Sequence, residues 1–216
     1  MAQKVTTQRK IVTCNGGRGT DWDAPQNWSG TYGGDLGRYA DELRSQRLVG
    51  EYGAWRSLGL HSEDGHELRG PLSEERMCAL LGTKLRLADS VRAFACGQFA
   101  WPFTTHANPG RDFGAQGEQL HDGRRPLDRV GPAYNKGLLT IWGEPTDAFY
   151  LYRARLVPAA RGPMVYLVSH SWPGRWTAPG RKSGITAYSN CEEVELFDDV
   201  GGRSLGRGRR EDGGPL

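Results

Sequence analysis

The order of apolar segments in the middle of this 216-residue chain constrains its fold more than any other feature. A short apolar run at residues 47–51 precedes residues 74–89, in which apolar side chains recur at helical spacing after Ser73, a residue suited to a helix N-cap. Residues 91–101 then form an almost continuous apolar run, as in strands that are buried on both faces. Strand, helix and strand in this order predict a βαβ unit with parallel strands.

The remaining segments extend this unit on both sides. Before it we expect two short strands and a helix, at residues 9–13, 23–28 and 36–45. After it, residues 102–134 have no periodicity, and a helix is expected at 146–156. Beyond Pro163 the pattern alternates with a period of two, which predicts an antiparallel β module with strands in residues 164–170, 184–190 and 193–197.

Composition excludes several classes of protein. The net charge of +3 is too small for nucleic-acid binding driven by bulk charge, and no run of apolar residues is long enough for a membrane span. The first residues lack the apolar core of a signal peptide, so a cytoplasmic location is the default expectation. The four cysteines form no C-x-x-C pair and the five histidines have no metal-ligand spacing. We therefore expect no metal and no cofactor.

Glu51 is the first candidate for catalysis, because α/β barrels place catalytic residues at the C-terminal ends of their strands. Position alone would also suit a surface carboxylate. From Glu51 onward the chain reads EYGAWRSLGLHS. This segment resembles the nucleophile segment of glycoside hydrolase family 2, whose β-glucuronidase branch has E-Y-G and G-L-H-S at this spacing. The resemblance implies that Glu51 is the nucleophile of a retaining mechanism and that His61 orients the active-site loop.

The same resemblance implies residues that bind the sugar. Trp101 ends a segment similar to the eighth barrel strand and would form part of the sugar-binding floor, although a core Trp is the alternative. Asn27 occupies the sixth-strand position, and the family places a Tyr that hydrogen-bonds to the nucleophile a few residues later. Without a gap this position is Ser29, whereas a different loop would place Tyr32 there. Asn135 and Lys136 resemble the pair that β-glucuronidases present to the substrate carboxylate. They are adjacent here but one residue apart in that branch, which favours a helix-capping or surface role for the pair over uronate recognition. The expected substrate is therefore a β-galactoside or a related β-linked sugar.

The fold class implied by the family is α/β: a partial (β/α)8 TIM barrel, about strands five to eight, followed by a partial antiparallel β-sandwich. We expect the C-terminal half of the catalytic barrel at residues 1–158, part of an immunoglobulin-like domain at 159–206 and a disordered tail at 207–216. The family's acid/base is the Glu of an Asn-Glu pair, which this sequence lacks. The chain alone is therefore expected to be inactive, and its exposed barrel edges would favour association.

Two other interpretations remain open. A carbohydrate-binding protein without turnover would use an aromatic cleft lined by Trp28, Trp55, Trp101 and Trp142. Nucleic-acid association would use the arginines of the Gly-rich C-terminal segment, Arg203, Arg207, Arg209 and Arg210. A solvated tail explains these arginines better, because they are not interleaved with aromatic residues. The expected partner is therefore a β-linked glycoside, and neither a nucleic acid nor a membrane.

Overall fold

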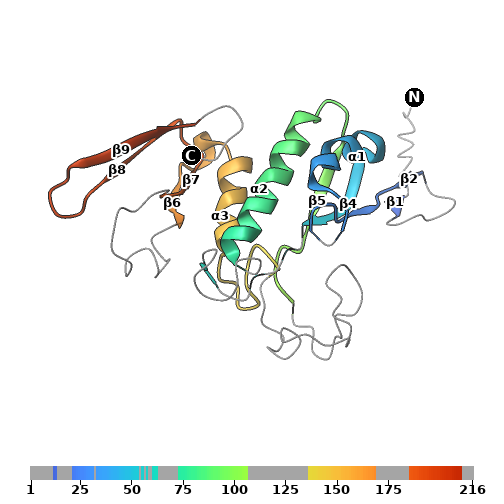
Figure 1. Ribbon diagram of the computed structural model, residues 1–216, viewed down its shortest axis with the longest axis horizontal. Coiled ribbons are helices and arrows are strands. Elements are labelled where there is room, and N and C mark those ends of the chain that lie inside the picture. The colour runs from blue at the N-terminus through green and yellow to red at the C-terminus, as the bar shows by residue number, and fades with distance from the viewer. Residues whose placement is uncertain are drawn as a thin grey trace, which may run out of the picture.

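The structure is a computed structural model (Figure 1). It describes residues 12–13, 21–31, 33–53, 55, 57, 60–62, 73–106, 136–168 and 185–210. For residues 12 and 13 it describes the backbone alone. The predicted residues Tyr32 and Asn135, and almost all of the aperiodic segment 102–134, lie outside this part of the chain. No helix within it has the length and apolar composition that a membrane span requires.

The N-terminal part is a parallel sheet. Strands β3 (Gln26–Asn27), β4 (Leu48–Gly53) and β5 (Gly97–Trp101) pair in that order and in parallel. The short strands β1 (Val12–Thr13) and β2 (Trp22–Asp23) form a second parallel pair. Helix α2 (Glu74–Ser90) connects β4 to β5, which confirms the predicted βαβ unit.

Two of the helices begin directly after a residue whose side chain caps them, and one of these residues, Ser73, was the predicted N-cap. Ser73 accepts a hydrogen bond from the Arg76 N–H and caps α2. Thr146 caps α3 (Asp147–Leu156) in the same way. Helix α1 (Tyr39–Gln46) follows a 3₁₀ turn. A side-chain oxygen at the N-cap satisfies one of the N–H groups that a helix leaves unpaired at its start.

The strand expected at residues 91–101 is shorter than predicted, because β5 starts only at Gly97. Val91 is fully buried, and its N–H donates to the carbonyl of Ala88 at the end of α2. The N–H groups of Phe94 and Ala95 then donate back to the Val91 carbonyl. The apolar residues before Gly97 therefore form a turn that caps the helix, and an apolar run alone does not distinguish such a turn from a strand.

A bulge in β4 places two of its large side chains on the same buried face. Val49 pairs with Gln98 and Tyr52 with Ala100, so β4 uses one residue more than β5 over this interval. In a regular strand, residues 49 and 52 would point to opposite faces. With the extra residue both are buried in the core.

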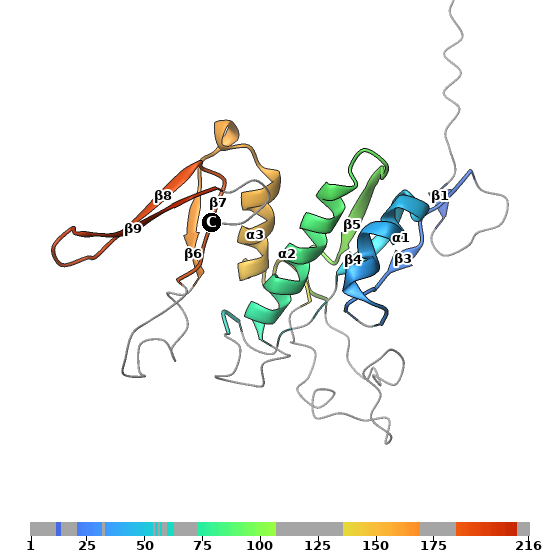
Figure 2. The same cartoon turned by 45° about the horizontal axis from the view of Figure 1, so that its top comes forward.

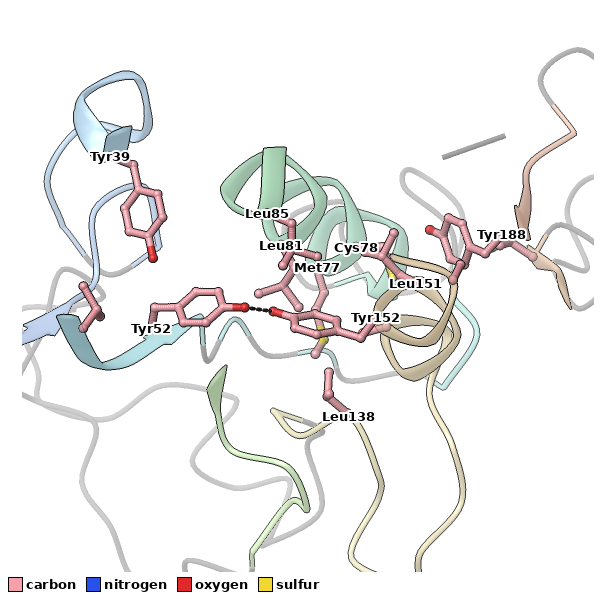
Figure 3. Close-up of a cluster of buried hydrophobic side chains, with 14 of the residues drawn as sticks. Tyr39, Tyr52, Met77, Cys78, Leu81, Leu85, Leu138, Leu151, Tyr152 and Tyr188 are labelled. Atoms are coloured by element: carbon pink, nitrogen blue, oxygen red, sulfur yellow. Dashed lines mark hydrogen bonds between the residues drawn. The ribbon is translucent and has the colours of Figure 1, made fainter. Parts of the chain in front are cut away.

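The core lies between the sheet and the helices. Figure 3 shows Tyr52 from β4 and Tyr152 from α3 pointing toward each other, with their hydroxyls 2.7 Å apart. Leu81 and Met77 of α2 are buried beside them. Figures 1 and 2 show α3 on the side of α2 that faces away from the sheet. One core therefore joins the parallel sheet to both later helices.

Beyond α3 the strands are antiparallel, as predicted. Strands β6 (Val165–Leu167) and β7 (Ala187–Ser189) pair next to α3. Strands β8 (Glu193–Phe197) and β9 (Ser204–Arg209) form a hairpin that projects away from the helices (Figure 1).

The hairpin departs from the predicted tail at residues 207–216. Strand β9 includes Arg207 and Arg209, so the structure is ordered beyond the expected boundary. Across the hairpin, an Arg207 Nη atom lies 2.9 Å from a Glu195 carboxylate oxygen, and Arg209 Nε lies 3.2 Å from Glu193. These cross-strand pairs of opposite charge stabilise the pairing of β9, a strand that has no buried residue. Residues 211–216 lie outside the described part of the chain.

Lys84 of α2 is fully buried beneath the sheet. Its Nζ lies 4.7 Å from the centroid of the Tyr39 ring and donates to the carbonyl of Asn27 at 3.4 Å. Burial lowers the pKa of this amine from 10.5 to about 8, although the charge of Glu42 acts in the opposite direction. A charge in this environment keeps little of its hydration, which disfavours the ammonium form.

We predict a specific pH dependence of stability from Lys84. Between pH 8 and 10.5 the unfolded chain binds more protons at this residue than the folded chain, so folding becomes more favourable as the pH rises across that window. The free energy of unfolding of the wild type, minus that of Lys84→Met, should therefore increase between pH 7 and pH 10. Urea denaturation at several pH values measures it. A difference that stays constant would contradict the assignment.

Candidate active site

The C-terminal edge of the parallel sheet gathers three of the predicted site residues. In register, Glu51 of β4 pairs with Gln26 of β3, and Gly53 pairs with Trp101 of β5. Asn27 occupies the next position of β3. Because parallel strands end at the same edge of a sheet, Asn27, Glu51 and Trp101 lie along one edge.

The two faces of this edge differ. Asn27 and Tyr52 are buried on the face that the helices cover. Alternation along the strands puts Glu51 on the opposite face, which carries the exposed aromatic side chains of β5. Phe99 is 63% exposed and Trp101 42% exposed. We call this the open face of the sheet. Aromatic side chains together with a few polar groups are a common lining of sites that bind small molecules.

Glu51 is half-buried and has a side-chain hydrogen-bond donor beside it. The Nε2 group of Gln26 donates to Glu51 Oε2 at 2.6 Å, and the indole N–H of Trp28 donates to Gln26 Oε1 at 3.2 Å. Burial raises the pKa of the Glu51 carboxyl, and the hydrogen bond from Gln26 acts in the opposite direction. Sequence analysis did not identify Gln26, because its importance depends on the register between β3 and β4.

Asn27 contacts α1 rather than the open face. Its amide nitrogen donates to Glu42 Oε2 at 2.9 Å and to Gln46 Oε1 at 3.1 Å, and its Oδ1 accepts from the Ser29 N–H. The Ser29 hydroxyl also donates to Glu42, at 2.7 Å. Asn27 therefore anchors the end of β3 to the helix, and its substrate-binding role stays a prediction.

Lys136 lies against the segment that follows Trp101. Its N–H donates to Thr105 Oγ1 at 3.2 Å, and the neighbouring Leu139 pairs with Thr104. The ring of Trp101 packs edge-on against His106, with centroids 5.9 Å apart. The chain thus returns to the C-terminal end of β5 after the long undescribed segment, and it brings Lys136 back to that end of the sheet.

His61 belongs to a separate buried network. Its Nδ1 lies 2.5 Å from Asp147 Oδ1, which also accepts a hydrogen bond from the Tyr166 hydroxyl at 2.6 Å. One oxygen of Glu74 accepts the N–H of His61 and the other accepts the N–H of Asp147. Glu74 and Asp147 are the first residues of α2 and α3. This network joins His61, in the loop after β4, to the first residues of two helices, and the loop-orienting role of His61 stays a prediction.

The charges of His61, Glu74 and Asp147 lie close enough to change the pKa values of His61 and Glu74. The hydrogen bond to Asp147 raises the pKa of the His61 imidazole, although burial acts against it. Burial, with the charge of Asp147 adding to it, raises the pKa of Glu74 to about 7. Two buried acids thus share one imidazole. The positive ends of both helix dipoles lie beside them, which favours negative charge at this point.

These three residues are also the group that could hold a metal ion in the described part of the chain. One ligand atom from each of His61, Glu74 and Asp147 lies within 4.8 Å of the other two. Asp147 Oδ2 is buried and has no hydrogen-bond partner there. The other three carboxylate oxygens already accept hydrogen bonds from the protein. Both Glu74 oxygens accept backbone N–H groups, and Asp147 Oδ1 accepts from the imidazole. We therefore interpret the group as a hydrogen-bonded joint.

No protein-family model matches the chain. Over 87% of its length it is 29% identical to a putative β-glucuronidase of Formosa agariphila, and it covers 24% of that protein. The chain is homologous to β-glucuronidases. It spans about a quarter of the length of this curated relative.

Solved structures agree with this relationship. A Parabacteroides merdae β-glucuronidase superposes with a TM-score of 0.66 at 26% identity, over 89% of this chain and 23% of that one. Bacteroides uniformis β-glucuronidase 2, covalently bound to cyclophellitol-6-carboxylate aziridine, gives a TM-score of 0.63 at 26% identity, over 89% of this chain and 22% of that one. The homologues are thus glycosidases, and this chain corresponds to a fraction of each.

We predict that the buried network contributes strongly to stability. Asp147→Ala removes the acceptor of His61 and Tyr166, and it should lower the free energy of unfolding by about 3–5 kcal/mol, the usual cost of breaking a buried charged pair. Glu193→Ala is the control, because Glu193 and both of its partners in the hairpin, Arg207 and Arg209, are exposed. This substitution should lower the free energy of unfolding by less than about 1 kcal/mol. Urea denaturation compares the two, and equal losses would contradict the prediction.

Proposed function

We propose that the chain carries the nucleophile half of a retaining glycoside hydrolase of family 2, with Glu51 as the nucleophile. The observation that carries this proposal is the position of Glu51 on the open face, at the C-terminal edge of a parallel sheet. Trp101 is exposed on the same face. The homology to β-glucuronidases supports the same reaction class.

The proposed reaction is a double displacement. The Glu51 carboxylate attacks the anomeric carbon while an acid elsewhere protonates the departing glycosidic oxygen, and a glycosyl-enzyme ester forms. The same acid, now a base, then takes a proton from the water that hydrolyses the ester. Because only ionised Glu51 attacks, and its pKa is raised, activity should fall as the pH drops through that pKa.

The architecture proposed with this function is the C-terminal half of a (β/α)8 barrel, about strands five to eight, in residues 1–158. The parallel strands β1 to β5 and the crossover helix α2 support it. Residues 159–206 would begin an immunoglobulin-like domain, in keeping with antiparallel β6 to β9. The acid/base would come from outside these residues, because the chain has no Asn-Glu pair.

The proposed substrate is a β-glucuronide. The relatives are β-glucuronidases, and Lys136, which resembles the lysine that β-glucuronidases present to the substrate carboxylate, lies beside the segment after Trp101 at the C-terminal end of the sheet. The adjacency of Asn135 and Lys136 led the sequence analysis to favour a β-galactoside. The two sugars differ in the configuration at C4 and also at C6, where a uronate carries a carboxylate and galactose a hydroxyl. A cation placed near C6 would therefore favour the uronate.

A second candidate is a carbohydrate-binding protein without turnover. Trp142 is 72% exposed and Trp101 is 42% exposed, so aromatic surface is available for stacking on a sugar. Trp28 and Trp55, which were expected in the same cleft, are half-buried. Exposed aromatic rings serve binding equally well with or without a working nucleophile.

A chimaera tests the main proposal. This chain would replace the matching quarter of the Formosa agariphila relative, and we expect the product to hydrolyse an aryl β-glucuronide faster than the matching β-galactoside. Glu51→Gln should lower kcat/KM by at least about a thousandfold. Glu195→Gln, in the exposed hairpin, is the matched control and should change little. Equal activity in both variants would contradict the role of Glu51, and a preference for the galactoside would restore the sequence-based substrate.

The chain alone should be catalytically silent, because it lacks the acid/base. We expect no release of aglycone from either aryl glycoside by the purified 216 residues. Turnover that disappears in Glu51→Gln would contradict this expectation. In calorimetry on the same chain, sugar binding that survives Glu51→Gln but is lost in Trp101→Ala would favour the non-catalytic candidate.

A further inference from the structure

The Glu51 carboxylate is held at one of its two oxygens. In the part of the chain that the structure describes, Gln26 is the residue whose side chain hydrogen-bonds to it, through Oε2 at 2.6 Å. Oε1 accepts no hydrogen bond from these residues. A carboxylate fixed at one oxygen keeps the other available for a reaction, and the fixed oxygen restricts rotation of the group.

The Gln26 amide is itself oriented. Trp28 donates its indole N–H to Gln26 Oε1 at 3.2 Å. Because an indole N–H can only donate, the amide oxygen must face Trp28 and the NH₂ group must face Glu51. The backbone adds a further constraint, since the Gly50 N–H donates to the Pro25 carbonyl at 3.0 Å and keeps β3 in register with β4.

The residue that the sequence aligns with the expected tyrosine does not perform this task. Ser29 fills that position when the segments are aligned without a gap, and its hydroxyl donates to Glu42 on α1 at 2.7 Å. Ser29 therefore points to the helix-covered face. The donor to Glu51 comes instead from the residue before Asn27, on the opposite face of β3.

We propose that Gln26, oriented by Trp28, is the positioning residue that holds the nucleophile of this site. The proposal rests on the assignment of Glu51 as the nucleophile. The neutral amide stabilises the carboxylate charge and aims Oε1 toward the open face, where the anomeric carbon would lie. An amide does not titrate, so this support is the same at every pH at which the enzyme works.

Titration of Glu51 in the intact 216-residue chain tests the hydrogen bond without any need for turnover. Carboxyl-¹³C NMR of protein labelled in its glutamates follows the ionisation, and the resonance missing from Glu51→Gln gives the assignment. Gln26→Met keeps the length of the side chain but removes the donor, so the pKa of Glu51 should rise. Trp28→Phe should move it in the same direction by less, because the amide is present but no longer oriented.

Gln98→Met is the matched control. Gln98 lies in the same sheet but accepts its hydrogen bond from Tyr39 on the helix-covered face, so its loss should leave the Glu51 titration unchanged. Tyr32→Phe tests the competing donor and should also leave it unchanged. The proposal is overturned if Gln26→Met titrates like the wild type, or if Tyr32→Phe shifts Glu51 and Gln26→Met does not.

Kinetics of the chimaera separate this proposal from the proposed function. There, Gln26→Met should lower kcat by about tenfold to a hundredfold with little change in KM, as expected for a displaced nucleophile. If Gln26→Met shifts the titration but Glu51→Gln leaves activity intact, the hydrogen bond stands and the nucleophile assignment fails. If Glu51→Gln abolishes activity but Gln26→Met affects neither readout, the positioning role alone is refuted.

Discussion

The burial of Tyr52 fixes the geometry of the candidate site. This side chain lies in the core beneath β4, and its hydroxyl is 2.7 Å from that of Tyr152 on α3. Successive residues of a strand point to opposite faces, so burying Tyr52 forces Glu51 onto the open face. The bulge in β4 is part of the same constraint, because it lets Val49 and Tyr52 share the buried face. A slip of one residue would bury the carboxylate instead.

Charged groups hold the described end of the loop after β4, in addition to the packing of Trp55 against the core. His61, Glu74 and Asp147 come from the loop and from the first turns of two helices, and hydrogen bonds join them into one joint. Such a joint is costly to bury and is stable only when its members are all present. It therefore ties the position of the loop after the candidate nucleophile to the packing of α2 against α3.

Local patterns in the sequence predicted the elements but not the contacts between them. Ser73 marked the start of α2, since capping depends on adjacent residues, and α3 begins one residue after the expected start at 146. The start of β5 was misjudged because a buried turn at Val91 is as apolar as a strand. Gln26 gained its importance from strand register, and Asp147 meets His61 across 86 residues of sequence. No periodicity records contacts at such separations.

Covalent trapping tests the central claim, that Glu51 is the nucleophile of a β-glucuronidase-type site. Cyclophellitol-6-carboxylate aziridine is the compound found covalently bound to Bacteroides uniformis β-glucuronidase 2. It can be incubated with the chimaera that contains this chain, and the adduct can be mapped by peptide mass spectrometry. The account predicts one adduct, on the peptide that contains Glu51, and none in Glu51→Gln. An adduct on another residue, or no adduct where the unaltered relative is labelled, would contradict it.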